Sequence, residues 1–245
     1  MIAGATASDV SSPQPSYLVL GCKPWNRRVY EQLRATLPGE WRYVGSPENL
    51  SVAAVRDFAP RYLFFLHWSW KVPLEIVDNF ECVCFHMTDV PFGRGGSPLQ
   101  NLIIRGYTET LLSALRMTRE FDAGPVYLKQ QMSLEGSAEE IYLRASELSS
   151  KMIDRLIREN PKPKAQEGEV VNFKRRKPEE SEIGTAASLQ ELHDSIRMLD
   201  ADGYPHAYFN YAGFRFEFRR SALYDGRIVA DVTITQPETA GKSQS

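Results

Sequence analysis

One stretch of the chain decides the fold and the site that we expect: CFHMTDVPFGRGGSPLQNLI, at residues 84–103. It places His86 at the end of an apolar strand, directly before a loop rich in glycine and proline. Such a loop keeps the backbone sharp and exposed, so that a substrate can reach the imidazole. Further along, FDAGP at residues 121–125 supplies a carboxylate, Asp122, in a turn. An imidazole can carry a proton near neutral pH, and a carboxylate beside it fixes its tautomer and raises its basicity. These two residues predict a reacting centre.

Around this stretch, continuous apolar runs alternate with helical patterns, which predicts parallel strands that helices cover on both faces. In such a sheet, ligands bind beyond the carboxyl ends of the strands, where His67 and His86 both fall. The N-terminal half is therefore expected to be α/β. Its elements are strands at 16–22, 41–44, 61–67 and 82–86, with helices at 26–37 and 50–58 and a short one ending at Asn79.

After the central stretch we expect a helix at 98–105 and two strands, 107–117 and 124–134, that bracket Asp122. Ser137 and Glu140 form a capping box that opens a long amphipathic helix ending near Asn160. The chain then turns polar and continues with a helix from Ser188 and strands at 207–211 and 214–218. The expected organisation is a disordered tail at 1–15, a main domain at 16–161, a small α+β subdomain at 162–236 and a frayed tail at 237–245.

The composition limits which binding partners and which cellular compartment we expect for this protein. The 245 residues carry 29 basic and 31 acidic side chains, so no global field attracts nucleic acid or a membrane. No apolar stretch approaches the roughly 20 residues that span a bilayer, and the first sixteen residues do not read as a signal peptide, so we expect a cytoplasmic protein. The three cysteines, Cys22, Cys82 and Cys84, lie in apolar contexts and lack zinc-ligand spacing, and we therefore expect no metal.

The same residues resemble the signature of the formyltransferases that use 10-formyltetrahydrofolate. That family carries Asn-x-His, a Leu-Pro step, an Arg-Gly pair, a proline before an apolar helix, and Asp-x-Gly. The resemblance implies a one-carbon transferase with a Rossmann-like, mainly parallel sheet, helices on both faces and a small α+β C-terminal subdomain. The matching residues, in the family's order, are His86, Pro91, Arg94, Gly95, Pro98 and Asp122–Gly124.

The chain departs from that signature at one place, because Cys84 stands where the family has asparagine. An amide there would donate a hydrogen bond to the formyl oxygen, and a thiol is a much weaker donor. Either another group holds the oxyanion, with the amide of Asn101 as a candidate, or the activity is reduced.

The resemblance gives the other residues their expected roles. His86 stabilises the oxyanion or relays the amine proton, while Asp122 orients His86 and accepts the proton through water. Each also has a plain structural interpretation, as a hydrogen-bonded core histidine and as a turn carboxylate. The folate would contact Trp68, Ser69, Trp70, Lys71, Val72 and Asp122, although an aromatic cluster is also typical of a core.

The acceptor is expected at the loop after His86. The candidate contacts are Thr88, Asp89, Arg94, Gly95, Ser97 and Gln100, where Arg94 either steers a phosphate or pins its loop. Family analogy favours a nucleotide-linked amino sugar as the acceptor. Residues 166–245 hold 10 Lys/Arg against 13 Asp/Glu, a net charge of −3, whereas a tail that binds tRNA should be basic, so we expect no nucleic acid. Another small amine, hydrolysis of the formyl-folate, and a binding protein without catalysis remain alternatives. The Tyr- and Phe-rich strands of the tail make a homodimer an option.

Overall fold

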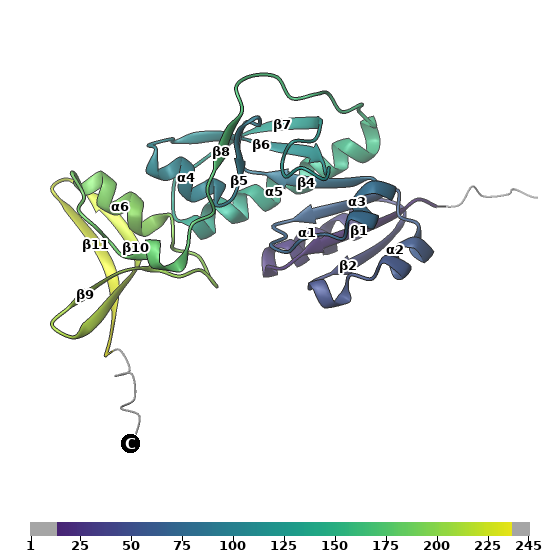
Figure 1. Cartoon of the computed structure of the whole chain (residues 1–245). Coiled ribbons are helices and arrows are strands. Elements are labelled where there is room, and N and C mark those ends of the chain that lie inside the picture. Colours follow the sequence, from purple (N-terminus) through teal and green to yellow (C-terminus); the bar gives the residue numbers. More distant parts are fainter. Residues whose placement is uncertain (1–13, 237–245) are drawn as a thin grey trace, which may run out of the picture. The chain divides into compact units, whose positions relative to one another are not determined.

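The structure is a computed structural model that describes residues 14–236 (Figure 1). Of the tails that we expected to be disordered or frayed, at 1–15 and 237–245, residues 1–13 and 237–245 lie outside the described residues, whereas Pro15 is described and its carbonyl accepts from the backbone N–H of Glu40. The chain divides into two compact units, which meet between Cys82 and Val83. The boundary that we predicted after residue 161 falls inside the second unit. Each unit is described by itself below.

The first unit is an α/β layer with three parallel strands in the order β2-β1-β3. These are β1 (Ser16–Gly21), β2 (Glu40–Val44) and β3 (Tyr62–Leu66), and the helices between and after them are α1 (Pro24–Thr36), α2 (Val52–Phe58) and α3 (Leu74–Asn79), with a short 3-10 turn, η1 (Pro47–Asn49). All five residues of β3 are buried, as are five of the six in β1. The predicted parallel strands are confirmed in this unit, because runs buried on both faces need no polar alternation.

The second unit is built on antiparallel strands in the order β4-β6-β7. These are β4 (Cys82–His86), β6 (Glu109–Arg116) and β7 (Val126–Ser133). The 22-residue helix α5 (Ala138–Glu159) packs against β6 and β7 (Figure 1). The predicted capping box is present, since Ser137 Oγ accepts from Glu140 N while Glu140 Oε2 accepts from Ser137 N. The helix ends where Asn160 takes a left-handed conformation.

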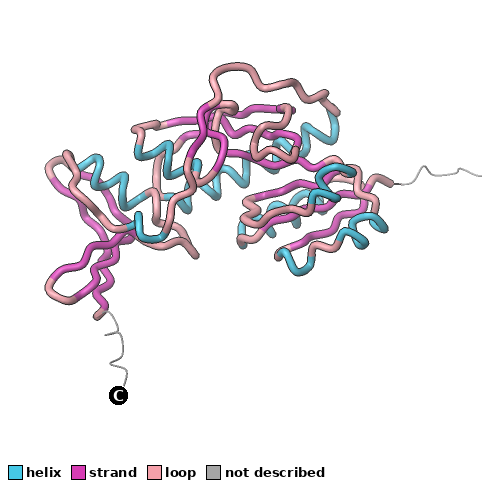
Figure 2. The backbone as a smooth tube through the Cα atoms, viewed as in Figure 1, coloured by secondary structure: helices cyan, strands magenta, loops and turns pink. Residues whose placement is uncertain are grey.

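Two segments far apart in the sequence pair beside β4. Strand β5 (Phe92–Gly95), which precedes helix α4 (Pro98–Ile104), pairs in parallel with β8 (Val171–Phe173). The chain reaches β8 from α5 as an extended loop (Figure 2). We interpreted residues 162–168 as a linker, yet the main chains of Val126 and Lys164 exchange two hydrogen bonds. Composition could not reveal these contacts, because they use the backbone.

The last part of the chain is a small α+β subdomain. Helix α6 (Leu189–Arg197) packs against β10 of an antiparallel sheet in the order β11-β10-β9. The strands are β9 (Ala207–Tyr211), β10 (Phe214–Tyr224) and β11 (Arg227–Thr235), and the 3-10 turn η2 (Pro178–Ser181) precedes α6. We predicted β9 and the first half of β10, but not β11. Within residues 14–236 no helix has the length and apolar character needed to cross a bilayer.

Candidate active site

The site is organised around His86, the last residue of β4. The residue is 8% exposed, and the ring nitrogen Nε2 lies 2.8 Å from the carbonyl oxygen of Gly93. A carbonyl can only accept a hydrogen bond, so Nε2 carries the proton in this arrangement. The loop of residues 87–92, with a cis Val90–Pro91 peptide, turns the chain back so that Gly93 reaches the ring.

The second ring nitrogen, Nδ1, faces Asp122. Nδ1 and Asp122 Oδ1 are 3.6 Å apart, which is too long for a hydrogen bond but close enough for a strong charge interaction. The Asp122 side chain is 18% exposed. The neutral ring therefore presents a lone pair on Nδ1 beside a carboxylate, and a proton taken up there creates an imidazolium that the carboxylate stabilises. We expected Asp122 to fix the tautomer, but in this geometry the carbonyl of Gly93 does so.

Asp122 is held from both its side chain and its main chain. Its Oδ2 accepts a hydrogen bond of 3.0 Å from the backbone N–H of Gly95. Its backbone φ of +53° is a left-handed conformation that Asp tolerates better than most residues. Gly124 fixes the end of this turn, because a Cβ there would lie 1.8 Å from the carbonyl oxygen of Arg116. The turn thus presents the carboxylate in one orientation.

Gln166 also belongs to this site, although we did not predict it from the sequence. Its amide Nε2 donates to the carbonyls of Asp122 (2.7 Å) and Gly124 (2.8 Å), and its Oε1 accepts from Arg94 Nε and Nη2. Arg94 Nη1 also lies 3.7 Å from Glu120. The side chain of Gln166 therefore joins the Asp122 turn to the glycine-rich loop. The polar surroundings of Gln166 predicted a loop, and no local pattern marks a glutamine that binds a distant main chain.

The Gly93 carbonyl has a second donor. Thr88 Oγ1 donates to it at 3.2 Å, and the main-chain oxygen of Thr88 accepts from Ser113 Oγ at 2.7 Å. Thr88 and Ser113 have no exposed surface. Gly93 has φ +75°, and a Cβ there would lie 2.7 Å from both Phe173 and Thr88. These contacts keep the carbonyl aimed at His86.

The residues predicted to contact the acceptor have different surroundings in the structure. Thr88 is fully buried. Gln100 is 5% exposed, and its amide donates to Tyr142 Oη and to the Met198 carbonyl. Both side chains form hydrogen bonds in the interior, and neither position supports contact with an acceptor. Asp89 is exposed and pairs with Lys129, which fixes the loop. The contacts of Arg94 fit the loop-pinning role. Gly95 lies at the site through its N–H, and Ser97 Oγ accepts from the backbone of Arg176.

The two residues suggested for the oxyanion differ in position. The amide of Asn101 donates to the carbonyls of Gly96, Ser97 and Lys174, so its N–H groups are used within the fold and do not support a role at the formyl oxygen. Cys84 is partly exposed on β4, two residues before His86. Residues two apart on a strand point to the same face of the sheet, so the thiol of Cys84 and the imidazole of His86 lie on the same face.

The residues predicted for folate lie in the first unit, in the loop after β3. Trp68 and Trp70 form an edge-to-face pair with ring centroids 5.0 Å apart, and Trp70 is 42% exposed. Ser69 and Lys71 are exposed, whereas Val72 is buried. The indole Nε1 of Trp68 is buried without a hydrogen-bond partner. A buried donor of this kind is costly unless an acceptor arrives, which fits a ligand carbonyl.

His67 begins the same loop and has a different environment from His86. Its φ is +50°, and its carbonyl accepts from Cys22 Sγ at 2.9 Å. Burial, together with the charge of Lys23, lowers the pKa of His67 from 6.5 to about 4. The ring is therefore neutral at physiological pH, and with so low a pKa it is a weak base for the proton of an amine.

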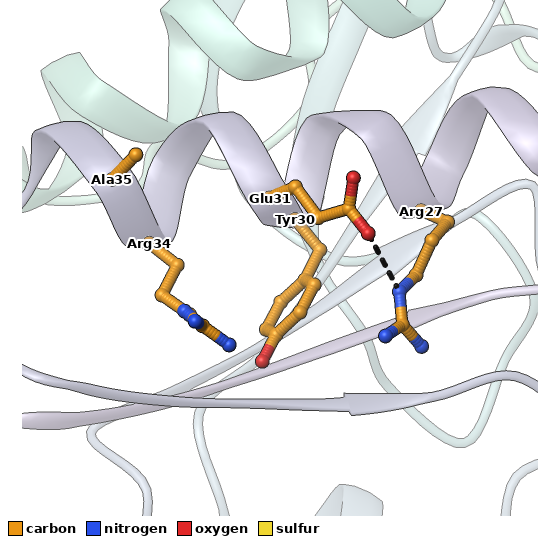
Figure 3. A pocket seen from close by; sticks show the side chains of 5 residues that line it. All are labelled: Arg27, Tyr30, Glu31, Arg34 and Ala35. Atoms are coloured by element: carbon orange, nitrogen blue, oxygen red, sulfur yellow. Dashed lines mark hydrogen bonds and ion pairs between the residues drawn. The ribbon is translucent and has the colours of Figure 1, made fainter.

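A surface hollow of about 450 Å³ lies along α1 in the first unit (Figure 3). It is lined by Arg27, Tyr30, Glu31, Arg34 and Ala35, and Arg27 Nε donates to Glu31 Oε1 at 3.2 Å. None of the predicted site residues lines it. Within residues 14–236, no group of three or more His, Cys, Asp or Glu side chains is arranged to hold a metal ion.

Fold and site together define an α/β protein in which a buried histidine faces a partly buried aspartate. The family model for the C-terminal domain of methionyl-tRNA formyltransferase matches residues 178–235. The solved methionyl-tRNA formyltransferase from Clostridium thermocellum is 42% identical, with a TM-score of 0.88 over 91% of this chain and 99% of that one. The chain belongs to the formyltransferase family.

Two further comparisons show how much of its relatives the chain covers and how widely the fold is shared. Methionyl-tRNA formyltransferase of Sinorhizobium medicae is 30% identical over 178 residues, which cover 67% of this chain and 56% of that protein. The chain spans just over half the length of the curated relatives it matches. A sugar N-formyltransferase from Shewanella shares the fold at 16% identity, with a TM-score of 0.66 over 86% of this chain and 98% of that one. The predicted formyltransferase fold, with its C-terminal subdomain, is confirmed.

Proposed function

We propose that this protein is an N-formyltransferase that moves the formyl group of 10-formyltetrahydrofolate to a primary amine. The observation that carries the proposal is the pair formed by His86 Nδ1 and Asp122 Oδ1, 3.6 Å apart. Membership of the formyltransferase family supports the same reaction. In the transfer, the amine nitrogen forms a bond to the formyl carbon, the bond from that carbon to folate N10 breaks, and one proton passes from the amine to N10.

In this proposal, His86 accepts the proton and then donates it. Its Nε2–H is bound to Gly93, so Nδ1 is the atom that takes the proton from the attacking amine and later returns it to the leaving nitrogen. The Asp122 carboxylate stabilises the imidazolium that exists between these two events. Removing a positioned group of this kind typically costs about a hundred- to a thousandfold in rate.

The donor fits the loop after β3. The edge-to-face pair of Trp68 and Trp70 offers apolar surface for a flat ring system, and the buried Nε1–H of Trp68 lacks an acceptor that a ring carbonyl would supply. Aromatic walls with a few polar atoms are typical of sites for small ligands. The folate supplies the activated formyl group.

We propose a nucleotide-linked amino sugar as the acceptor. The net negative charge of residues 166–245 supports a small acceptor over a long RNA backbone. Methionyl-tRNA is the second candidate, and the 42% identity to a protein named methionyl-tRNA formyltransferase, 99% of which is matched, favours it. Formylation of another small amine, hydrolysis of the formyl-folate, and binding without transfer are the remaining alternatives.

Release of tetrahydrofolate from 10-formyltetrahydrofolate tests these possibilities directly. The full chain is incubated with the donor alone, with nucleotide-linked amino sugars, with the same sugars lacking the nucleotide, and with charged methionyl-tRNA. Release that requires a nucleotide-linked sugar supports the proposal. Release only with methionyl-tRNA would show that methionyl-tRNA, and not an amino sugar, is the acceptor. Release without an amine indicates hydrolysis. Donor binding without any release overturns the proposed transfer.

A further inference from the structure

A cluster of positive charge lies against the glycine-rich loop of the site. Residues 93–108 and 171–177 together contain six Lys or Arg side chains and no Asp or Glu. The two segments are neighbours, because β5 pairs with β8. The six residues are Arg94, Arg105, Lys174, Arg175, Arg176 and Lys177. This local charge contrasts with the net negative charge of the tail as a whole.

The backbone attaches these cations firmly to the loop. A Cβ on Gly96 would lie 2.4 Å from the Cβ of Arg175, so the arginine side chain starts directly beside the loop. The carbonyl of Lys174 accepts from Asn101 Nδ2 at 3.0 Å. The guanidinium of Arg105 lies over the Phe173 ring at 4.6 Å. The backbone at Lys174 and Arg175 is thus ordered by several contacts.

The same loop reaches the catalytic carboxylate. Gly95, the residue before Gly96, donates its N–H to Asp122 Oδ2. Adjacent residues, Gly95 and Gly96, therefore make the carboxylate contact and the close approach to Arg175. An acceptor whose amine reaches His86 could extend its polar end toward these cations.

The carboxylates around the cluster leave most of its charge available. In the described part of the chain, Arg94 is the member that forms an ion pair, with Glu120 at 3.7 Å. The guanidinium of Arg176 donates to the Glu180 carbonyl. Glu180 Oε2 accepts from the backbone N–H of Lys177, and Asp89, Glu109, Glu169 and Glu179 flank the two segments in sequence. Lys174, Arg175 and Arg105 have exposed side chains.

We infer that Lys174 and Arg175, with Arg105 beside them, form a phosphate-binding surface for the diphosphate of the acceptor. Charge-assisted hydrogen bonds from Lys and Arg recognise phosphate oxygens, and Arg can do so with two bonds at once. A cluster of this small extent fits one or two phosphates better than a long RNA backbone, which needs many contacts. The inference rests on the proposed transfer to a nucleotide-linked amine, and it names the residues that recognise the nucleotide.

A binding measurement tests this surface without relying on catalysis. Isothermal titration calorimetry with UDP and with dTDP, at low and at physiological salt, is done on the wild-type chain and on the double variant Lys174→Gln/Arg175→Gln. The control is Lys151→Gln/Arg155→Gln on α5, which removes two exposed cations of the same kind, far along the chain from the loop. We expect the first variant to bind about tenfold or more weakly, and the control to bind within twofold of the wild type.

The outcomes separate this inference from the proposed function. Loss of nucleotide binding confined to Lys174→Gln/Arg175→Gln supports the surface, even in a chain that formylates no tested amine. The wild type could instead bind bulk tRNA but not UDP or dTDP, and the same variant could lose that binding. This result would overturn the assignment of the surface to a nucleotide diphosphate and would assign it to RNA. Absence of binding to the wild type, or equal effects in both variants, would overturn the surface even if formyl transfer is observed. With an active acceptor, the variant should raise KM and leave kcat unchanged.

Discussion

His67 follows the buried strand β3 and His86 is the last residue of β4, yet the two rings have different surroundings. Burial, with the charge of Lys23 as the smaller cause, lowers the pKa of His67 to about 4, so it stays neutral. His86 has a carbonyl on one ring nitrogen and a carboxylate 3.6 Å from the other. The position at a strand end brings a histidine to the place where ligands bind, but its neighbours decide whether it can carry a proton.

The largest effect that sharpens this comparison should come from His86→Asn. The amide cannot take up a proton from an amine, so turnover should fall about a hundred- to a thousandfold. Steady-state release of tetrahydrofolate measures the loss, and the thermal midpoint checks that the chain still folds. His193→Asn, a histidine on α6 that bonds to Ser221, is the control. Turnover within threefold of wild type in His86→Asn would remove this residue from the chemistry.

Asp122→Asn should have the next largest effect. Asn keeps the shape, tolerates the left-handed backbone and can still accept from the N–H of Gly95, but it removes the charge opposite Nδ1. We expect kcat to fall about ten- to a hundredfold with the donor KM within threefold. Asp154→Asn, which removes an exposed carboxylate of α5, is the matched control. An unchanged kcat would mean that the carboxylate only shapes the turn.

His67→Asn tests the other side of the comparison through stability. The unfolded chain binds a proton at His67 near pH 6.5, whereas the folded chain does so only near its pKa of about 4. Wild-type stability is therefore lost as the pH falls from 6.5 to 4. Urea unfolding of the wild type should lose about 2 kcal/mol from this group between pH 7 and pH 5, and the variant should lack that part of the loss.

In the same variant, turnover at pH 7 should stay within threefold of the wild type, because a ring with a pKa of about 4 is too weak a base to take the amine proton in the proposed transfer. An identical change of stability with pH in both proteins would contradict the assignment of the low pKa. A collapse of turnover would instead place His67 in the site.

The smallest effect is expected from Cys84→Asn. The substitution restores the amide of the family signature two residues before His86, on the same face of β4. We expect a rate between the wild-type value and about tenfold above it, since an amide is the better donor to a developing oxyanion. Cys84→Ser, which removes the thiol without adding an amide, is the control. Loss of activity in the asparagine variant alone would mean that the amide does not fit the pocket.

The sequence predicted the elements whose signals are local. The apolar run of β3, the capping box at Ser137 and the Asp122 turn each carry their pattern within a few residues. The pairing of β5 with β8 and the hydrogen bond from Gln166 to Asp122 join residues dozens of positions apart, and in each of them at least one partner is a main-chain atom. Patterns of side-chain type cannot encode these contacts. The burial of Thr88 and Gln100 was not predictable for a related reason, because polar residues beside a site also serve as buried hydrogen-bond partners.

The most direct test of the account is the protonation of the His86 ring, which ¹⁵N NMR resolves for each nitrogen. The His86→Asn spectrum identifies the signals. We predict that the neutral ring carries its proton on Nε2, bound to Gly93, and leaves Nδ1 unprotonated beside Asp122. A neutral ring protonated on Nδ1 would contradict the account, because it would leave no lone pair at the atom that faces the carboxylate.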